Sequence, residues 1–424
     1  MKVFKFGGAS VKDANAVKNV GEVIKLHNDD LVIVISAMGK TTNGLESVVE
    51  SYLAKDGKTE EKLNQVKAFH TSILNDLFEN KKHPIFNEIH NTFVEIEWEI
   101  EDEAVREYDY IYDQIVSVGE VLSTKIVSAY LNETGLKNTW QDIRNVVQTD
   151  NTHRNAKVDW QLTEELAQKE IQNKIDKGQS VIITQGFIGS SSELFTTTLG
   201  REGSDFSAGI LAHCLNAESV TIWKDVPGML NADPKWFDDT TKLDNISYHE
   251  AVELAYYGAS VIHPKTIKPL HNKNIPLYVK SFVSPKNDGT VINQNTKEDG
   301  LVPSFIFKMN QVLISISAKD YSFIMEDSLS HIFGLFSEKG VQINLMQNAA
   351  ISFSVCVDFD KQKTMPLIDE LKKNYKILYN DNLELVTIRH YDDKTIERVT
   401  LNKEILVEQK SRQTARFVMK NKIS

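Results

Sequence analysis

The sequence predicts an α/β fold, in which helices cover both faces of a mostly parallel sheet, followed by a smaller α+β region of ferredoxin-like type. Three observations predict it. Apolar runs such as Leu31–Ile35 are continuous, which is typical of strands buried on both faces of a parallel sheet. Strand patterns alternate with helical patterns up to about residue 280. After a polar stretch at 284–300 the order of the elements changes.

Composition excludes several classes of function. The chain has 424 residues, which suits two or three domains, and its net charge of −11 argues against binding to nucleic acid. Its two cysteines, Cys214 and Cys356, lie far apart in apolar contexts and predict neither a disulfide framework nor a zinc site. There is no leader pattern, and no apolar run is long enough to cross a bilayer. We expect a cytoplasmic protein with no membrane or nucleic-acid partner.

The first ten residues have the pattern of an anion-binding turn. Val3–Phe6 is predicted to be a short buried strand, Gly7-Gly8-Ala9-Ser10 a turn, and 11–27 a helix. Glycines let backbone N–H groups approach a phosphate, a helix N-terminus adds its dipole, and Lys5 adds a point charge. Taken alone, the pattern fits a purely structural turn equally well.

The second predicted strand, Leu31–Ile35, ends in the small, hydroxyl-rich loop Ser36–Gly44. Open α/β sheets bind ligands at the carboxyl ends of their strands, so this loop is a candidate part of a site. The alternative is an ordinary loop in which Thr41 or Thr42 caps the next helix.

A long helical region follows, from about residue 47 to 130. Its acidic stretch Glu95–Asp109 is interpreted as a solvated helix face rather than a metal site. Glu120 differs from these carboxylates because it follows Gly119 and opens an apolar helix that runs to about Asn132. It is placed either to favour the helix dipole or to face a substrate ammonium group.

Alternation then resumes. We expect strands at 138–147, 180–189, 220–228 and 275–279, and helices at 162–177, 208–215 and from 248 onward. The segment Thr196–Ala208 combines hydroxyl side chains, two glycines, Arg201 and Asp205 immediately before a helix. These residue types bind phosphates and carboxylates, so a functional role is favoured over a plain N-cap at Asp205.

The C-terminal third follows a different order. Strands are predicted at 311–318, 341–346, 351–359 and 383–388, and helices at 328–338 and 365–374. This β-α-β-β-α-β order is that of a ferredoxin-like unit. The last segment, 395–419, predicts only short strands and no helix.

Seven motifs in this order resemble aspartate kinase of the amino-acid kinase family. They are Lys5-Phe-Gly-Gly-Ala-Ser10, Val118-Gly-Glu120, Gly186-Phe-Ile-Gly189, Thr196-Thr-Thr-Leu-Gly-Arg201, Gly203-Ser-Asp205, Trp223-Lys-Asp225 and His263-Pro264. The resemblance implies an amino-acid kinase catalytic domain at 1–290 with a helical insertion at about 47–130, a linker at 291–303 and an ACT-like regulatory region at 304–424. The first ACT-like unit is expected to be complete and the second shortened.

The activity implied is transfer of the γ-phosphoryl group of ATP, with Mg²⁺, to the side-chain carboxylate of L-aspartate, at the start of lysine, threonine and methionine biosynthesis. An ionised carboxylate needs no strong base, so the demand is to bring two anions together and stabilise the transferring group. By resemblance, the catalytic residues are Lys5, Arg201 and Asp205. The aspartate-binding residues would be Ser36, Thr42, Glu120, Arg201 and Ser204. The nucleotide-binding residues would be Lys5, Gly7, Gly8, Ser10, Lys224, Asp225, Leu230, Lys235, Ser260 and Val261. No side chain is assigned as a metal ligand, although Asp205 is expected either to orient Lys5 and Arg201 or to help place magnesium.

Three positions depart from the common pattern of the family. Ala9 replaces a usual Thr, Glu202 replaces a usual Gly beside Arg201, and Ser260 stands where many members carry a Lys. Lys224 or Lys265 would then have to supply the missing cation. A kinase for glutamate or acetylglutamate, and a catalytically weak regulatory homologue that binds amino acids, are the alternatives.

The resemblance also predicts an effector site for threonine or lysine. Its candidate residues are Met325, Ser328, Leu329, Asn344, Gln347 and Asn348. Acidic residues that would meet the ammonium groups of lysine are missing at Asn344 and Ala350, so we expect weak or altered lysine feedback. Because ACT-like units bury their sheet edges by pairing between chains, a homodimer through residues after about 304 is expected.

Overall fold

The computed structural model describes residues 1–101, 105–259, 262–320 and 322–422, in two compact units. The first unit comprises Met1–Met229, Lys242–Val252 and Ile262–Lys297, and the second Leu230–Thr241, Glu253–Val261 and Glu298–Ser424. The division assigned from the sequence, with a linker at 291–303, stays a prediction. Within the described residues, no helix is both long and apolar enough to span a membrane.

The first unit is built on an eight-stranded sheet. In spatial order its strands are β11 (Asn245–Ser247), β13 (Thr290–Asn293), β12 (Leu277–Ser281), β8 (Ser219–Lys224), β1 (Lys2–Phe6), β2 (Leu31–Ile35), β5 (Val181–Gln185) and β3 (Thr139–Gln141). Neighbouring strands are parallel except β12 and β13. The apolar N-terminal strand β1 therefore lies in the interior of the sheet, as its residues predict.

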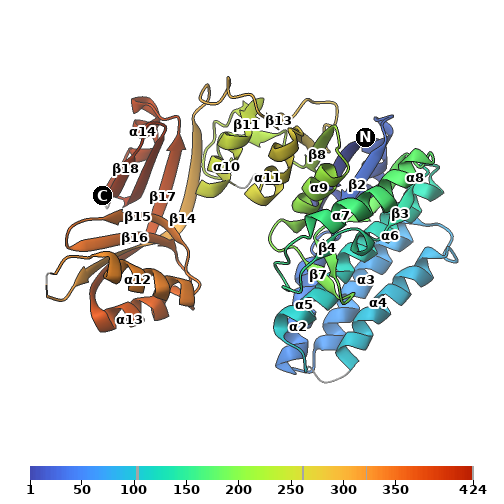
Figure 1. Cartoon of the computed structure of the whole chain (residues 1–424), viewed down its shortest axis with the longest axis horizontal. Helices are drawn as coiled ribbons and strands as arrows, with labels where there is room; N and C mark the ends of the chain where they lie inside the picture. The colour runs from blue at the N-terminus through green and yellow to red at the C-terminus, as the bar shows by residue number, and fades with distance from the viewer. Residues whose placement is uncertain (102–104, 260–261, 321, 423–424) are drawn as a thin grey trace. The chain divides into compact units, whose positions relative to one another are not determined.

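Helices cover both faces of this sheet (Figure 1). They are α1 (Ala14–Lys25), α2 (Thr41–Ala54), α3 (Thr59–Leu77), α4 (Ile85–Glu101), α5 (Tyr108–Val116), α6 (Val118–Glu133), α7 (Trp160–Ala167), α8 (Asn173–Asp176), α9 (Gly203–Cys214) and α11 (Pro264–Lys273). Helix α10 (Tyr248–Tyr257) begins in the first unit and ends in the second. Phe4, Phe6, Ile33 and Ile35 join one apolar cluster with α1–α6. Helix α9 packs on β1, β2 and β8, and α11 packs against α9. The predicted three-layer αβα fold is confirmed.

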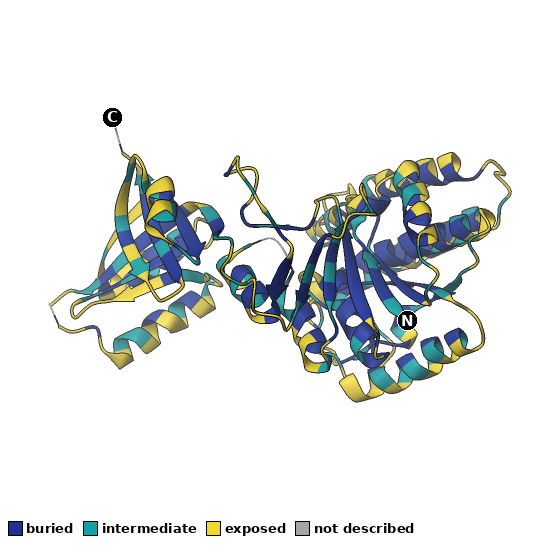
Figure 2. Cartoon of the chain, turned by 90° about the horizontal axis from the view of Figure 1, so that it is seen from above, coloured by how far each residue is buried: buried dark blue, intermediate teal, exposed yellow. Residues whose placement is uncertain are grey.

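Burial follows the same plan. Figure 2 shows the strands of this sheet largely in dark blue, whereas the outer faces of the surrounding helices are yellow. All five residues of β2 are buried. Helical structure fills most of 41–133, as predicted, and a π-helical turn at Gln168–Gln172 joins α7 to α8.

Two local expectations were wrong. The expected strand at 138–147 stops at Gln141, because Asp142 accepts a hydrogen bond from the backbone N–H of Arg144 and caps a 3-10 turn, Ile143–Asn145. Lys40, rather than either threonine after it, occupies the N-cap position of α2. Within the polar stretch 284–300, β13 completes the sheet between β11 and β12.

Shorter strands complete the chain before residue 300. They are β4 (Gln148–Thr149), β6 (Ile188–Ser191) and β7 (Thr196–Thr198), which form a three-stranded sheet, and β9 (Met229–Leu230) and β10 (Lys242–Leu243).

The second unit is built on a six-stranded antiparallel sheet. Its spatial order is β15 (Ile343–Asn348), β16 (Ser352–Asp358), β14 (Ser304–Ala318), β17 (Tyr375–Arg389), β19 (Thr414–Asn421) and β18 (Lys403–Lys410). Its helices are α12 (Glu326–Glu338), α13 (Thr364–Asn374) and α14 (Asp393–Thr400), visible in Figure 1. The sheet is consistent with the expected ACT-type α+β region.

The long strands β14 and β17 extend through both halves of this sheet. Their pairing register shifts between Lys308 and Gln311, where Asn310 has a positive φ of 55°. On one side of this break, β14 and β17 combine with β15, β16, α12 and α13 in the predicted β-α-β-β-α-β order. On the other side they combine with α14, β18 and β19.

The prediction that 395–419 contains no helix was wrong. Asp392 accepts from the backbone N–H of Thr395, and the Thr395 hydroxyl accepts from the backbone N–H of Asp392, so a capping box starts α14. Val399 is buried in an apolar cluster with Phe305 and Phe417. The second half of the sheet is thus shortened but keeps one helix.

Candidate active site

The candidate site lies at the carboxyl ends of the central parallel strands of the first unit. Lys5 is the next-to-last residue of β1. It pairs in register with Val34, the next-to-last residue of β2, and with Ile222, which lies two residues before the end of β8. A cavity of about 580 Å³ opens there. Its lining residues are Lys5, Gly8, Ser36, Ala37, Gly39, Thr42, Tyr112, Glu120, Arg154, Phe187, Thr198, Gly200, Arg201, Glu202, Gly203, Ser204, Asp205 and Lys224.

An ion pair between Lys5 and Asp205 forms the floor of this cavity. The Nζ atom of Lys5 is 2.6 Å from Oδ1 of Asp205, and the two side chains are only 11% and 6% exposed. Asp205 lies in the first turn of α9, whose N-terminus faces the end of β1. Pairing lets both charges remain in a poorly solvated place, where a lone charge would be costly. The lysine is therefore held at the cavity and oriented by the carboxylate.

Glu120 is a buried carboxylate in the same cavity. It lies in the first turn of α6 and accepts hydrogen bonds from the backbone N–H groups of Ala37 and Gly186. Among the described residues, its Oε2 atom has no hydrogen-bond partner. Burial raises the pKa of Glu120 to about 8, although Lys5 and the two backbone donors act in the opposite direction. Such an atom is available to a cationic ligand.

Gly8 allows two loops to meet at the cavity wall. A Cβ atom on Gly8 would lie 2.8 Å from the carbonyl oxygen of Ala37, closer than real contacts allow. The backbone N–H of Gly39 donates to the carbonyl of Gly8 at 3.1 Å. The turn after β1 and the loop after β2 therefore interlock, which sets Lys5 beside Ser36 and Thr42.

Arg201 and Glu202 lie on the exposed side of the cavity. Glu202 has a φ of 54° at the N-cap position of α9, a left-handed conformation that favours glycine. Because Glu202 stands where the family pattern has glycine, an acidic side chain lies beside Arg201 and the backbone at residue 202 is somewhat strained. The pKa of His263, lowered by burial, is affected by the charges of Glu202 and Arg201, so His263 is their neighbour.

Nine of the residues predicted for the site line this cavity together. They are Lys5, Gly8, Ser36, Thr42, Glu120, Arg201, Ser204, Asp205 and Lys224. Gly7 and Ser10 lie in the same turn as Gly8 without lining the cavity, and the backbone N–H of Ser10 donates to the carbonyl of Gly7.

The other predicted nucleotide residues are not part of the lining. Asp225 is exposed directly after β8, and Leu230 and Lys235 belong to the second unit. Ser260 and Val261 lie outside the described residues. Of the two lysines considered as replacements for a cation at 260, Lys224 lines the cavity, whereas Lys265 donates to Oδ1 of Asn155 and lines a neighbouring pocket.

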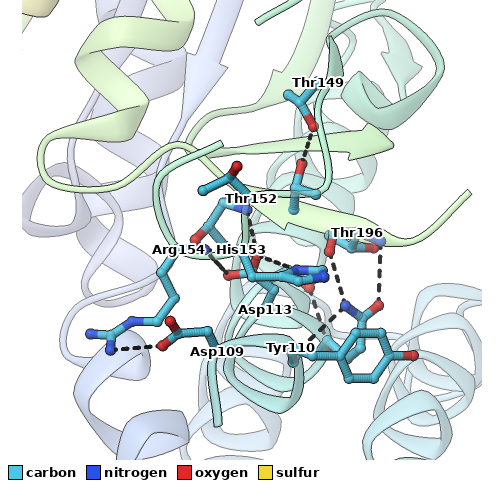
Figure 3. Close-up of polar contacts among 12 residues, drawn as sticks. Asp109, Tyr110, Asp113, Thr149, Thr152, His153, Arg154 and Thr196 are labelled. Carbon is cyan, nitrogen blue, oxygen red and sulfur yellow. Dashed lines mark hydrogen bonds and ion pairs between the residues drawn. The ribbon is translucent and has the colours of Figure 1, made fainter. Parts of the chain in front are cut away.

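Sequence reasoning missed part of the cavity wall. Tyr112 and Arg154 line it, from α5 and from the loop after β4. Neither had a signal in the sequence, because α5 has an ordinary amphipathic pattern and the loop has no motif. Figure 3 shows that this loop meets α5 at Asp113, whose pKa is raised by burial although several donors stabilise its charge.

The donor set does not form a metal cage. In the described ranges, no group of three or more His, Cys, Asp and Glu side chains is placed to hold a metal ion. Of the buried carboxylates in the cavity, Asp205 is paired with Lys5. Mg²⁺ commonly binds through one or two carboxylates together with substrate phosphates, so this donor set fits a metal that arrives with a nucleotide.

The predicted effector residues lie in the second unit. The backbone N–H of Ile324 donates to the carbonyl of Ala350, which brings the start of α12, with Met325, beside the end of β15. Ser328 and Leu329 lie on α12, and Gln347 and Asn348 are exposed on β15, an edge strand. The side chain of Asn344 bonds Lys308 and Gln311, so it is less available to a ligand than expected.

The sequence matches the model of the amino acid kinase family over residues 1–281. This chain belongs to the amino acid kinase family. It is 31% identical over 398 residues to lysine-sensitive aspartokinase 3 of Escherichia coli, covering 91% of this chain and 86% of that protein.

Two solved structures are similar over nearly the whole chain. The structure of E. coli aspartokinase III with lysine and aspartate has a TM-score of 0.83 at 28% identity, covering 99% of this chain and 95% of that one. The structure of the same enzyme with aspartate and ADP has a TM-score of 0.81 at 28% identity, covering 99% and 96%. The similarity extends over both units, so the chain is an aspartokinase homologue from end to end.

Proposed function

We propose that this chain is an aspartate kinase, which transfers the γ-phosphoryl group of ATP to the side-chain carboxylate of L-aspartate. The observation that carries the proposal is the cavity in which the unpartnered Oε2 atom of Glu120 lies with Lys5 and Arg201. An amino acid with two carboxylates and one ammonium group offers charges complementary to these side chains. Relatives named aspartokinases, and a similar structure that holds aspartate and ADP, support the same conclusion.

In the proposed reaction, different residues bind different groups of the amino-acid substrate. Glu120 accepts the substrate ammonium group, and Arg201 binds the α-carboxylate with its planar guanidinium group. Ser36, Thr42 and Ser204 add hydrogen bonds. The side-chain carboxylate then remains free as the nucleophile, which is already ionised at neutral pH.

Phosphate binding is the task of the turn after β1 and of nearby cations. Lys5, oriented by Asp205 at 2.6 Å, faces the charge that develops on the transferring phosphoryl group. The backbone of Gly7 and Gly8 approaches the phosphates, and Ser10, whose buried hydroxyl has no partner among the described residues, lies in the same turn. Lys224 replaces the cation absent at Ser260, and Asp225, directly after it, adds a further nucleotide contact. Mg²⁺, bound with ATP, neutralises phosphate charge.

The finer assignments belong to the same proposal. The reaction would open lysine, threonine and methionine biosynthesis in the cytoplasm. The second unit would bind an amino-acid effector, threonine or lysine, near Met325, Ser328, Leu329, Gln347 and Asn348, and a homodimer would form through edges of its sheet. A relative named lysine-sensitive and a similar structure that contains lysine favour lysine, whereas the missing acidic side chains at Asn344 and Ala350 favour a weak lysine response.

A parallel assay of three acceptors tests the proposal. Purified chain is incubated with Mg-ATP and L-aspartate, L-glutamate or N-acetylglutamate, and acyl phosphate is trapped as a hydroxamate. Hydroxamate that depends on aspartate, and is lost in Lys5→Ala but not in the surface control Lys18→Ala, is the expected result. Preference for another acceptor, or binding without turnover, would instead support a different amino-acid kinase or a regulatory homologue.

A further inference from the structure

A buried carboxylate on α5 joins two loops of the active-site wall. The Asp113 side chain is fully buried. It accepts from the Thr198 hydroxyl at 2.6 Å, from the backbone N–H of Thr198 at 3.0 Å and of Arg154 at 3.1 Å, and from Nδ1 of His153 at 2.9 Å. Figure 3 shows Asp113 beside His153 and Arg154. A carboxylate without solvent needs such donors, so breaking this set would loosen both loops together.

The two loops held by Asp113 each contain an arginine: the loop after β4 contains Arg154, and the loop after β7 contains Arg201. The backbone N–H of Ala156 donates to the carbonyl of Thr198 at 3.0 Å, which continues the contact. A Cβ atom on Gly200 would lie 3.1 Å from the carbonyl oxygen of Arg154. Arg201 follows at once, and both arginines line the cavity. Their backbones are thus held side by side.

The side chain of Arg154 is held by the same helix. Its guanidinium carbon lies 4.5 Å from the ring centre of Tyr112 and 5.2 Å from that of Tyr108, and its Nη1 atom is 3.2 Å from Oδ1 of Asp109. Its φ is 61°, a conformation that a residue with a side chain keeps only where its surroundings impose it. The arginine is 45% exposed and therefore open to a ligand.

The position of Arg154 favours the amino-acid side of the cavity. It follows β4, which belongs to the small sheet with β6 and β7. In the main sheet, β5 and β3 lie on one side of β1 and β2, whereas β8, which carries the proposed nucleotide residue Lys224, lies on the other. The hydroxyl of Tyr112, under the guanidinium, donates to Glu46 on α2, the helix that also carries Thr42.

We propose that Arg154 is a second binding residue for the α-carboxylate of the amino-acid substrate, beside Arg201, and that Asp113 is the positioning residue for both. The proposal rests on the proposed function, because it deepens how the same site recognises aspartate. A guanidinium group that is stacked on aromatic rings is pre-organised, so it loses little freedom when it binds a carboxylate.

Steady-state kinetics of the full chain test the role of Arg154. In Arg154→Ala, KM for aspartate should rise at least tenfold, with KM for ATP changed less than twofold and kcat less than threefold, and Arg154→Lys should recover part of the loss. Arg106→Ala is the matched control, since Arg106 stacks 5.0 Å from Tyr110 and does not line the cavity. An unchanged KM for aspartate in Arg154→Ala, or a rise confined to KM for ATP, would overturn the proposal.

Asp113→Asn tests the positioning role. The asparagine side chain keeps the shape of aspartate, but its amide NH₂ group faces the hydrogen-bond donors that the carboxylate accepts from. KM for aspartate should rise without a matching rise for ATP, and the loss in Asp113→Asn/Arg154→Ala should be smaller than the product of the single losses. A variant that only unfolds at lower temperature, with unchanged KM values, refutes positioning.

Calorimetric titration of L-aspartate separates this proposal from the function. Wild type that binds aspartate without turnover would refute the proposed kinase activity, and weaker binding by Arg154→Ala but not Arg106→Ala would still support the carboxylate site. Wild type that binds no aspartate would overturn both.

Discussion

The raised pKa of Glu120 predicts that aspartate binding weakens as the pH falls below 8. The carboxyl titrates at about pH 8 in the free protein because it is buried, and Lys5 is the charged group that acts on it. If only the ionised form accepts the substrate ammonium group, the apparent dissociation constant scales as one plus ten to the power of pKa minus pH. Between pH 8 and pH 6 this gives a rise of about 50-fold.

The substitution Glu120→Gln should remove this dependence. A neutral amide loses a hydrogen bond to a charged group, so binding at pH 8 should weaken about tenfold to hundredfold and then stay nearly constant down to pH 6. Glu133→Gln, the same change at an exposed position of α6, is the control. Calorimetric titration with L-aspartate at pH 6, 7 and 8 measures all three proteins.

Stability gives an independent check of the same carboxyl. Its folded pKa of about 8 lies above the ordinary glutamate value of 4.5, so the folded state holds a proton that the unfolded state has lost between these values. The free energy of unfolding should therefore fall with rising pH in this window, by up to about 1.4 kcal/mol per unit from this group. Glu120→Gln should lack this contribution. A wild type whose aspartate affinity is flat from pH 6 to 8 would refute the reasoning.

Three further predictions concern packing. Gly8→Ala should lower kcat/KM at least tenfold, because its Cβ would lie 2.8 Å from the Ala37 carbonyl, whereas Gly334→Ala, with open space around it, should leave kcat/KM unchanged; kinetics of both variants check this. Asp392→Ala should lower the urea midpoint of unfolding by removing the capping box of α14, and an unchanged midpoint would contradict that role. Burial raises the pKa of Cys214 and Cys356 to about 12, so neither should react quickly with a thiol reagent at pH 8 until the chain is unfolded, and rapid labelling of native protein would show the burial to be wrong.

The sequence predicted the sheet and much of the cavity because both depend on local signals. Continuous apolar runs specified strands such as β2, and glycines with hydroxyl residues marked the loops at their carboxyl ends. Lys5 and Asp205 were assigned by resemblance although 200 positions separate them, and the structure places them 2.6 Å apart.

The missed features depend on tertiary contacts or short caps. Arg154 enters the cavity wall because Asp113 and Tyr112, some forty residues earlier, hold its loop, and no spacing rule reports such a contact. Helix α14 is only eight residues long, and its capping box was the one signal that could have revealed it. Val146 and Val147 favoured a strand, but the cap at Asp142 ended it.

Identification of the phosphorylated carboxylate tests the central claim most directly. The acyl phosphate made from L-aspartate and ATP is reduced with borohydride, and the amino alcohol is identified by chromatography and mass spectrometry against standards. Phosphorylation of the side-chain carboxylate, with the α-carboxylate held by arginine, predicts homoserine. Formation of 3-amino-4-hydroxybutanoate would show attack by the α-carboxylate, and absence of any reduced product would contradict aspartate phosphorylation itself.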